Sequence, residues 1–131
     1  LRAPFSSLGL TAEAGSTLTF PKLIGYQKAF WALLSSEWIS AKECKDSGLA
    51  FKIVDSDSLM EVVYTHAGTL AKQPMVSLMT TKKLLMNQRR EMLRETYKRE
   101  NDSLFSLMGG QANLEAIAAF KERREPDFSN I

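Results

Sequence analysis

Cysteine, charge of one sign and long apolar runs are all scarce in this sequence. Its single cysteine, Cys44, excludes an internal disulfide framework and a zinc site built from several cysteines. No apolar run approaches the roughly 20 residues that a membrane-spanning helix needs. The net charge of +2 does not by itself indicate binding to nucleic acid. Residues 1–4 show neither an initiator methionine nor a signal-peptide pattern, so no targeting signal is visible and we expect the chain to be part of a longer polypeptide.

The 131 residues, of which 44% are hydrophobic, correspond to at most one domain with one core. Apolar residues recur at intervals of three and four between residues 23 and 34, which predicts a helix with Pro21 in its first turn. The segment Ser40–Glu43 has the capping-box pattern of a short helix that ends at Gly48. Residues 49–54 are of β type and predict one short strand.

The second half of the chain is predicted to be helical almost throughout. A helix capped within residues 55–58 is expected to end before Pro74. Two further helices follow, with a break at the polar residues 87–90 and a stop at residues 109–110. Asn113 is the predicted cap of a last helix.

Charged residues of both signs crowd the segment 82–100. Basic residues are interleaved there with Glu91, Glu95 and Glu100, which predicts a solvated helix face. The phosphate groups of a ligand, an acidic protein and a nucleic acid remain alternative partners for this face. The lack of interleaved aromatic side chains argues against RNA.

One carboxylate, Glu13, stands among small residues in a segment that is poor in charge. Small neighbours allow a ligand to approach the carboxylate closely. The amides of a following helix start would favour its anion, and burial would favour its acid form, so the environment can tune a general base. The alternative is an ordinary glutamate at the start of a helix.

The segment Leu8–Pro21, LGLTAEAGSTLTFP, resembles the catalytic segment of the crotonase (enoyl-CoA hydratase/isomerase) superfamily and is most similar to its Δ3,Δ2-enoyl-CoA isomerase branch. The segments Ile39–Ala50 and Ala119–Phe128 resemble two further motifs of the superfamily, in the same order. The resemblance implies a mainly α chain, the C-terminal part of a crotonase-like α/β fold with one or two short strands. Residues 1–54 would be the end of the crotonase core with the catalytic loop and helix, and residues 55–131 a C-terminal helical module of the trimerisation type.

By this resemblance, Glu13 matches the carboxylate that moves a proton from C2 to C4 of a 3-enoyl-CoA thioester. Hydratases of the superfamily carry a further carboxylate directly after the proline that matches Pro4. This sequence has Phe5 at that position. The resemblance therefore favours an isomerase that works with one carboxylate over a hydratase.

The resemblance also implies residues that bind the substrate and its coenzyme A. Ala14 and Gly15 stand where the family has Gly-Gly, so Ala14 adds one methyl group where the acyl chain or thioester would pass. Arg123 matches a basic position that helps to hold the nucleotide end of coenzyme A. The aromatic neighbour of that position falls at Leu104 or Phe105.

Further expectations rest on the same resemblance. The substrate would be an acyl-CoA thioester of fatty-acid β-oxidation, with coenzyme A as part of the substrate and with no separate cofactor and no metal. A homotrimer in a peroxisome or mitochondrion is expected, without a nucleic-acid partner or a membrane span. The two N–H groups of the family's oxyanion hole would lie upstream of this sequence, so we expect the isomerase to be incomplete in this chain. The alternative is a non-catalytic crotonase-like binding or scaffolding protein.

Overall fold

The computed structural model describes residues 1–131 and is built almost entirely from helices. Along the chain these are η1 (Ser6–Leu8), α1 (Ser16–Ile24), α2 (Tyr26–Leu34), α3 (Ala41–Ser47), η2 (Ser56–Ser58), α4 (Leu59–Ala71), α5 (Met75–Leu107) and α6 (Gln111–Glu122), where η denotes a 3-10 helix. The only β pairing is an isolated antiparallel bridge between Arg2 and Trp38. The predicted mainly α architecture is therefore confirmed.

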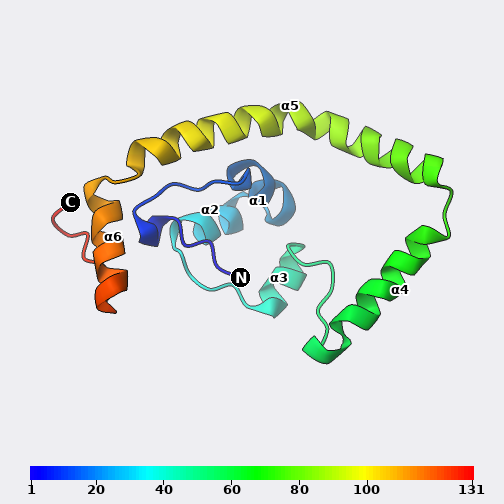
Figure 1. Ribbon diagram of the computed structural model, residues 1–131, viewed down its shortest axis with the longest axis horizontal. Coiled ribbons are helices and arrows are strands. Elements are labelled where there is room, and N and C mark those ends of the chain that lie inside the picture. The colour runs from blue at the N-terminus through cyan, green and yellow to red at the C-terminus, as the bar shows by residue number, and fades with distance from the viewer.

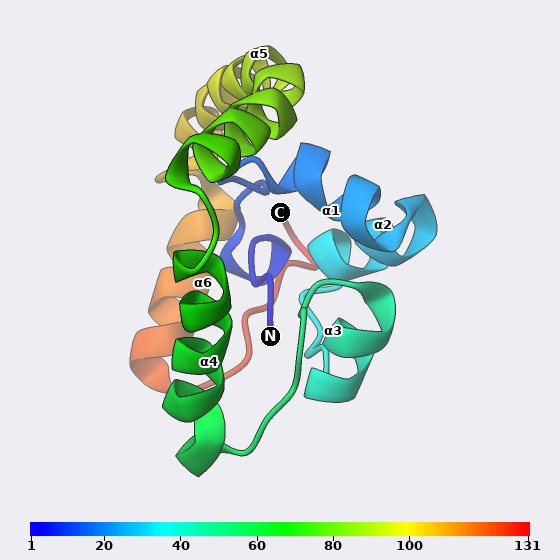
Figure 2. The same ribbon diagram turned by 90° about the vertical axis from the view of Figure 1, so that its right-hand side faces the viewer.

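Helix α5 spans the molecule and gives it the shape of an arch (Figure 1). Its first residues follow α4 at one end of the arch, and its last residues lead into α6 at the other end. Helices α1 and α2 lie inside the arch, beneath α5. The view turned by 90° shows α4, α5 and α6 on one side of the molecule and α1 to α3 on the other (Figure 2). The residues after position 54 therefore curve around α1 and α2 on one side of the molecule.

Gly25 divides the helix that was predicted after Pro21 into two helices. Its backbone, with φ 80° and ψ 160°, lies in a region that glycine alone adopts readily, and it interrupts the α-helical path. Helix α1 already begins at Ser16, so Pro21 lies inside this helix and its predicted place in the first turn is wrong. The two helices pack against each other and position the loop that precedes α1.

Helix α3 confirms the capping-box prediction. The Ser40 hydroxyl accepts the N–H of Glu43 over 3.2 Å, and the Glu43 carboxylate accepts the N–H of Ser40 over 2.8 Å. Hydrogen bonds from the Ser40 side chain and backbone hold the pKa of Glu43 below its ordinary value. The helix ends, as predicted, at Gly48 in a left-handed conformation, φ 87°.

The strand predicted at residues 49–54 is not formed. This segment runs between α3 and η2 without regular structure, and Phe51 within it is 80% exposed. A strand is stable only where a neighbouring strand completes its backbone hydrogen bonds, and no such neighbour lies beside these residues. The β-type residues therefore show only that these side chains favour a strand, not that a strand forms.

Two predictions in the second half of the chain are also wrong. Helix α5 continues without interruption through residues 87–90. Only glycine and proline strongly disfavour a helix, and this segment contains neither, so its polar side chains can face solvent without a bend. Asn113 is the third residue of α6, and Gly110 occupies the N-cap position. The predicted end of α4 before Pro74 and the predicted stop of α5 at residues 109–110 are confirmed.

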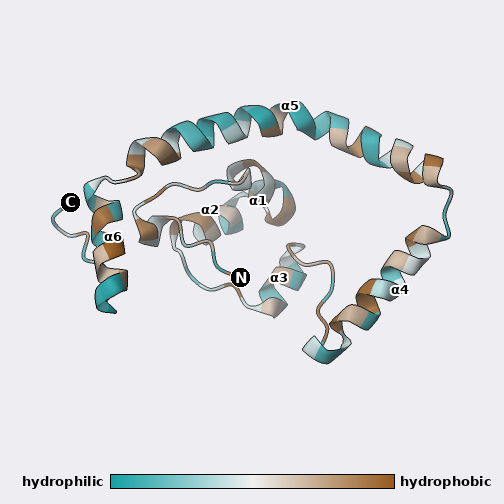
Figure 3. Ribbon diagram, in the orientation of Figure 1, coloured by the Kyte–Doolittle hydropathy of each residue, from teal (hydrophilic) through white to brown (hydrophobic).

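The hydrophobic core is small and includes Ala12 from the loop that carries Glu13. Ala3, Ala12 and Leu33 are buried there, and Phe5 and Phe20 pack against them. Large apolar side chains are exposed on α4 and on the first part of α5, namely Leu59, Met60, Val63, Tyr64, Leu70, Met75, Val76, Met79, Leu84 and Leu85. Figure 3 shows this apolar character along α4 and at the start of α5, whereas the middle of α5 is hydrophilic. None of the helices combines the length and apolarity needed to cross a membrane.

Candidate functional site

Glu13 lies in the loop that joins η1 to α1. Its side chain is exposed, whereas the preceding residue, Ala12, is buried in the small core. The N–H of Ser16, the first residue of α1, donates to the carbonyl oxygen of Glu13 over 3.0 Å. The backbone of Glu13 is therefore tied to the start of α1, and its carboxylate is exposed rather than buried.

Ala14 and Gly15 turn the chain from Glu13 into α1. Both residues are left-handed, with φ 58° and φ 73°. This conformation costs an alanine about 1–2 kcal/mol, so the turn needs support from its surroundings. Gly15 avoids that cost, and its lack of a side chain also lets α5 approach, because a Cβ would lie 3.2 Å from Leu93 Cδ2.

The support comes from Glu100, a buried residue of α5. One carboxylate oxygen, Oε2, accepts the N–H of Gly15 over 2.6 Å. The other oxygen, Oε1, accepts both the N–H of Thr17, over 2.9 Å, and the Thr17 hydroxyl, over 2.6 Å. A carboxylate at the N-terminus of a helix satisfies N–H groups that have no partner within the helix, and the helix dipole favours its negative charge.

A second anchor ties the beginning of the loop to α6. The Asn113 side chain donates from Nδ2 to the carbonyl oxygen of Leu8 over 2.9 Å, and its Oδ1 accepts the N–H of Gly109 over 3.0 Å. Gly9, with φ 64°, lies so close to α6 that a Cβ would be 2.4 Å from the carbonyl carbon of Ala112. The loop that carries Glu13 is thus held at one end by α6 and at the other by α5.

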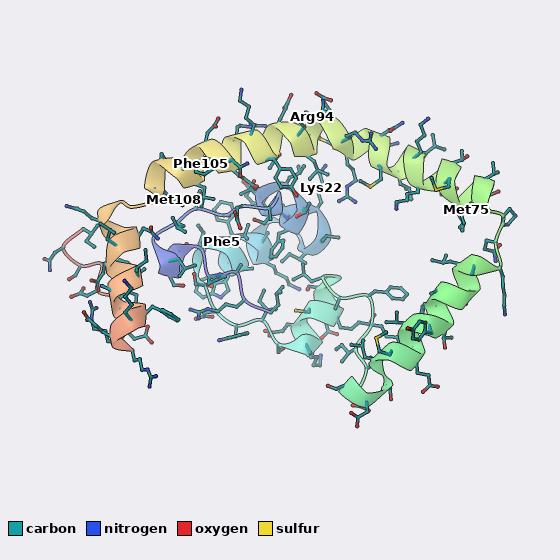
Figure 4. The ribbon with its side chains drawn as sticks, in the orientation of Figure 1. Phe5, Lys22, Met75, Arg94, Phe105 and Met108 are labelled. Carbon is teal, nitrogen blue, oxygen red and sulfur yellow. The ribbon has the colours of Figure 1, made fainter.

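Phe5 occupies the position at which the resemblance places the second carboxylate of a hydratase. Its half-buried ring packs against the core formed by Ala3, Ala12 and Leu33. Figure 4 shows Phe5 in the interior of the arch. This position therefore contributes packing and offers no acid or base.

Arg123 follows the last residue of α6 and is exposed. Its backbone is left-handed, φ 56°, and its N–H donates to the Phe120 carbonyl over 3.3 Å. The neighbouring Arg124 has ion-pair partners, because it contacts the carboxylates of Glu115 and Glu122. The Arg124 hydrogen bonds and the N–H of Asp127 lower the pKa of Glu115 from 4.5 to about 2. Of the two adjacent arginines, Arg123 is the one with no carboxylate partner among the ion pairs of the structure.

The structure does not bring Leu104 or Phe105 to Arg123. Both residues lie near the end of α5, with Leu104 half-buried and Phe105 67% exposed, and Figure 4 shows Phe105 there beside Met108. Arg123 lies at the far end of α6, whose 12 residues span about 18 Å. Glu13, Ala14 and Gly15, by contrast, form one continuous turn. The predicted site residues therefore lie in three separate places, namely the loop that carries Glu13, the end of α5 and the end of α6.

Glu100 lies in the segment that the charge pattern predicts to be a solvated face, and this prediction is wrong for Glu100. The structure shows that Glu100 is buried and that Glu91 and Glu95 are exposed. A signal was present in the spacing, since Leu93, Tyr97, Glu100 and Leu104 recur at intervals of three and four. A glutamate within an apolar stripe of this kind indicates a partner, because a buried charge must be hydrogen-bonded.

The model of the enoyl-CoA hydratase/isomerase family matches residues 1–130. Over 121 residues the chain is 31% identical to enoyl-CoA delta isomerase 2 from Rattus norvegicus, a match that covers 92% of this chain and 31% of that protein. Over 125 residues it is 27% identical to 2,3-dehydroadipyl-CoA hydratase from Escherichia coli, which covers 95% of this chain and 49% of that protein.

Solved structures also match the fold of this chain. The crystal structure of an enoyl-CoA hydratase/isomerase from Pseudoalteromonas atlantica superposes with a TM-score of 0.91 at 29% identity, covering 98% of this chain and 52% of that one. This match confirms the predicted C-terminal helical part of a crotonase-like fold. The chain spans about a third to a half of the length of these relatives. The extent of the family match, from residue 1 to residue 130, shows that the chain belongs to the enoyl-CoA hydratase/isomerase family.

Proposed function

We propose that the natural polypeptide containing this chain is an isomerase that shifts the double bond of a 3-enoyl-CoA to the 2-enoyl position. Glu13 is its catalytic carboxylate. It removes a proton from C2 of the thioester and returns that proton to C4.

The chemistry requires one group that alternates between base and acid. Loss of the C2 proton to the Glu13 carboxylate gives a dienolate whose charge extends over the thioester oxygen. The protonated Glu13 then donates to C4, and the double bond moves from C3–C4 to C2–C3. No atom is gained or lost, so no further reactant is needed, and the dienolate is stabilised by hydrogen-bond donors to its oxygen.

The observation that carries this proposal is the contrast between Glu13 and Phe5. The carboxylate is exposed on a loop that is anchored at both ends, whereas the position of a hydratase's second carboxylate is a phenylalanine packed in the core. Addition of water across a double bond needs a group that activates the water as well as a group that protonates the carbon. A single exposed carboxylate suits proton transfer within the substrate better than hydration.

The test uses the natural polypeptide and monitors the conversion of a 3-enoyl-CoA to the 2-enoyl-CoA by absorbance. Glu13→Gln keeps the shape of the side chain but cannot accept the C2 proton, so the rate should fall by orders of magnitude while binding of the CoA ester changes little. Glu91→Gln, at an exposed position of α5, is the matched control. Activity of Glu13→Gln within a few-fold of wild type would remove Glu13 from the mechanism.

The same assay separates the isomerase from its rivals. Hydration of a 2-enoyl-CoA should be weak in the wild type, because Phe5 replaces the second carboxylate. A wild type that hydrates rapidly would contradict the isomerase assignment. A wild type that binds CoA esters without converting them would favour the non-catalytic binding protein.

We also propose that the natural protein assembles as a homotrimer. The exposed apolar side chains of α4 and of the first part of α5 support an assembly, since a patch of this kind is usually covered by another surface. Light scattering coupled to gel filtration measures the mass directly. A monomeric mass at micromolar concentration would contradict the proposal.

A further inference from the structure

Glu100 joins α5 to the turn that follows Glu13. This carboxylate is 95% buried and makes three hydrogen bonds, all of them to residues within four positions of Glu13. Its partners, Gly15 and Thr17, are the residue before α1 and the second residue of α1. Glu100 itself is 87 positions away from Glu13 in the sequence. The long helix α5 thus places the buried Glu100 carboxylate beside the turn that follows Glu13.

The turn that receives this charge is conformationally demanding. Ala14 and Gly15 are both left-handed, and a residue with a side chain rarely adopts this conformation without support. The N–H of Gly15 points at Glu100 only because the turn has this shape. The hydrogen bond from Ser16 to the Glu13 carbonyl then links the same turn to the backbone of Glu13. Any relaxation at Ala14 and Gly15 therefore moves Glu13.

We propose that Glu100 is a positioning residue that holds the Glu13 carboxylate at the substrate by fixing the left-handed turn between Glu13 and α1. This inference rests on the proposed function, in which Glu13 transfers the proton. Glu100 does not contact the substrate in this scheme. Its role is carried by the backbone N–H groups of Gly15 and Thr17, which the carboxylate orients.

The main test is Glu100→Gln in the natural polypeptide. The amide keeps the size of the side chain, but its NH2 group meets an N–H donor where a carboxylate oxygen accepted one. Rates are expressed per CoA-ester-binding site, counted by calorimetry, so that a smaller folded fraction does not count as a slower enzyme. We expect kcat per site to fall by about 10–100-fold, the range produced by a displacement on the order of 1 Å, with KM within about twofold. Glu95→Gln, an exposed glutamate of the same helix, should leave both unchanged.

A role limited to stability would leave two further measurements unchanged. Deuterium at C2 of the substrate should slow Glu100→Gln more than wild type, because proton transfer from a displaced carboxylate becomes more rate-limiting. Ala14→Gly in the Glu100→Gln background should restore part of kcat, because glycine adopts the left-handed turn without support. An isotope effect equal to that of the wild type, or no recovery of kcat per site, would overturn the proposal.

Two further measurements test the role of Glu100 separately from the proposed reaction. Thr17→Val retains the Glu100 charge and loses only the hydroxyl contact, so it should fold and reduce kcat by a few-fold. Amide hydrogen exchange at Gly15 and Thr17 should be at least about tenfold faster in Glu100→Gln than in Glu95→Gln. Equal exchange would overturn the role of Glu100 whatever the activity is. If the wild type does not isomerise 3-enoyl-CoA, the proposed function fails, and the exchange rates alone decide whether Glu100 holds the turn.

Discussion

Replacing Gly9 by alanine is predicted to force η1 and α6 apart. Gly9 follows η1 with φ 64°, and a Cβ placed there would lie 2.4 Å from the carbonyl carbon of Ala112 and 2.5 Å from the amide nitrogen of Asn113. Both atoms belong to the backbone of α6, so no side-chain rotation can relieve the overlap. Either α6 or the loop that carries Glu13 must move.

The predicted loss of stability has two parts, the strain of the left-handed backbone and the overlap of the new Cβ with α6. An alanine in the left-handed conformation costs about 1–2 kcal/mol. Forcing an extra carbon into a packed contact costs about 1–3 kcal/mol more, so Gly9→Ala should lower the free energy of unfolding by about 2–5 kcal/mol. Gly109→Ala is a matched control, because its φ of 72° is similar and its Cβ would meet no atom within 4 Å. That variant should cost only about 1–2 kcal/mol.

Urea unfolding of the natural protein, followed by circular dichroism, gives the free energy of unfolding of each variant. The difference between Gly9→Ala and Gly109→Ala, about 1–3 kcal/mol, isolates the close approach of η1 to α6. Gly9→Ala should also lower kcat, because the loop that carries Glu13 shifts, whereas Gly109→Ala should not. Equal losses of stability in the two variants would refute the argument from the close approach.

Three further predictions concern α6 and α3. Arg123→Ala is expected to raise KM for a CoA ester and to leave kcat nearly unchanged, because contacts to the nucleotide end are alike in the ground and transition states; equal losses for CoA and pantetheine esters would contradict this role. Because hydrogen bonds from Arg124 and from the N–H of Asp127 lower the pKa of Glu115 from 4.5 to about 2, these contacts stabilise the fold above about pH 4.5 and lose that contribution as the pH falls towards 2. The difference in Tm between wild type and Arg124→Met should shrink over that range, and a constant difference would argue against the pair. Ser40→Ala removes the hydroxyl that accepts the N–H of Glu43, while the Ser40 N–H can still donate to the Glu43 carboxylate, and it should cost about 1 kcal/mol in thermal unfolding, so an unchanged Tm would be inconsistent with the N-cap role of Ser40.

Local features of the fold were predictable from the sequence. The capping box of α3 and its end at Gly48 depend on side-chain and backbone groups within eight residues of one another, and the structure shows both. The end of α4 before Pro74 follows from the ring of proline itself. Where a feature of the fold depends on residues that are close in the sequence, the sequence pattern was sufficient to predict it.

Predictions failed where the deciding partner was remote or absent. The strand at residues 49–54 had suitable side chains and no neighbouring strand in the structure. The predicted break at residues 87–90 treated polarity as a sign of a bend, although a helix with a solvated face tolerates it. Asn113 has the side chain of a helix cap, but it is used in a contact to Leu8 instead.

The sequence by itself determined which residues we propose for the chemistry. Glu13 stands out as the one carboxylate in its segment, its motif resembles that of the isomerase branch, and Phe5 is visible in place of a second acid. Tertiary structure alone decided what anchors the loop that carries Glu13, because Glu100 and Asn113 contact Gly15 and Leu8 from positions 85 and 105 residues away. Local patterns record the preferences of adjacent groups, whereas the partner of a buried carboxylate depends on which segments the folded chain brings together.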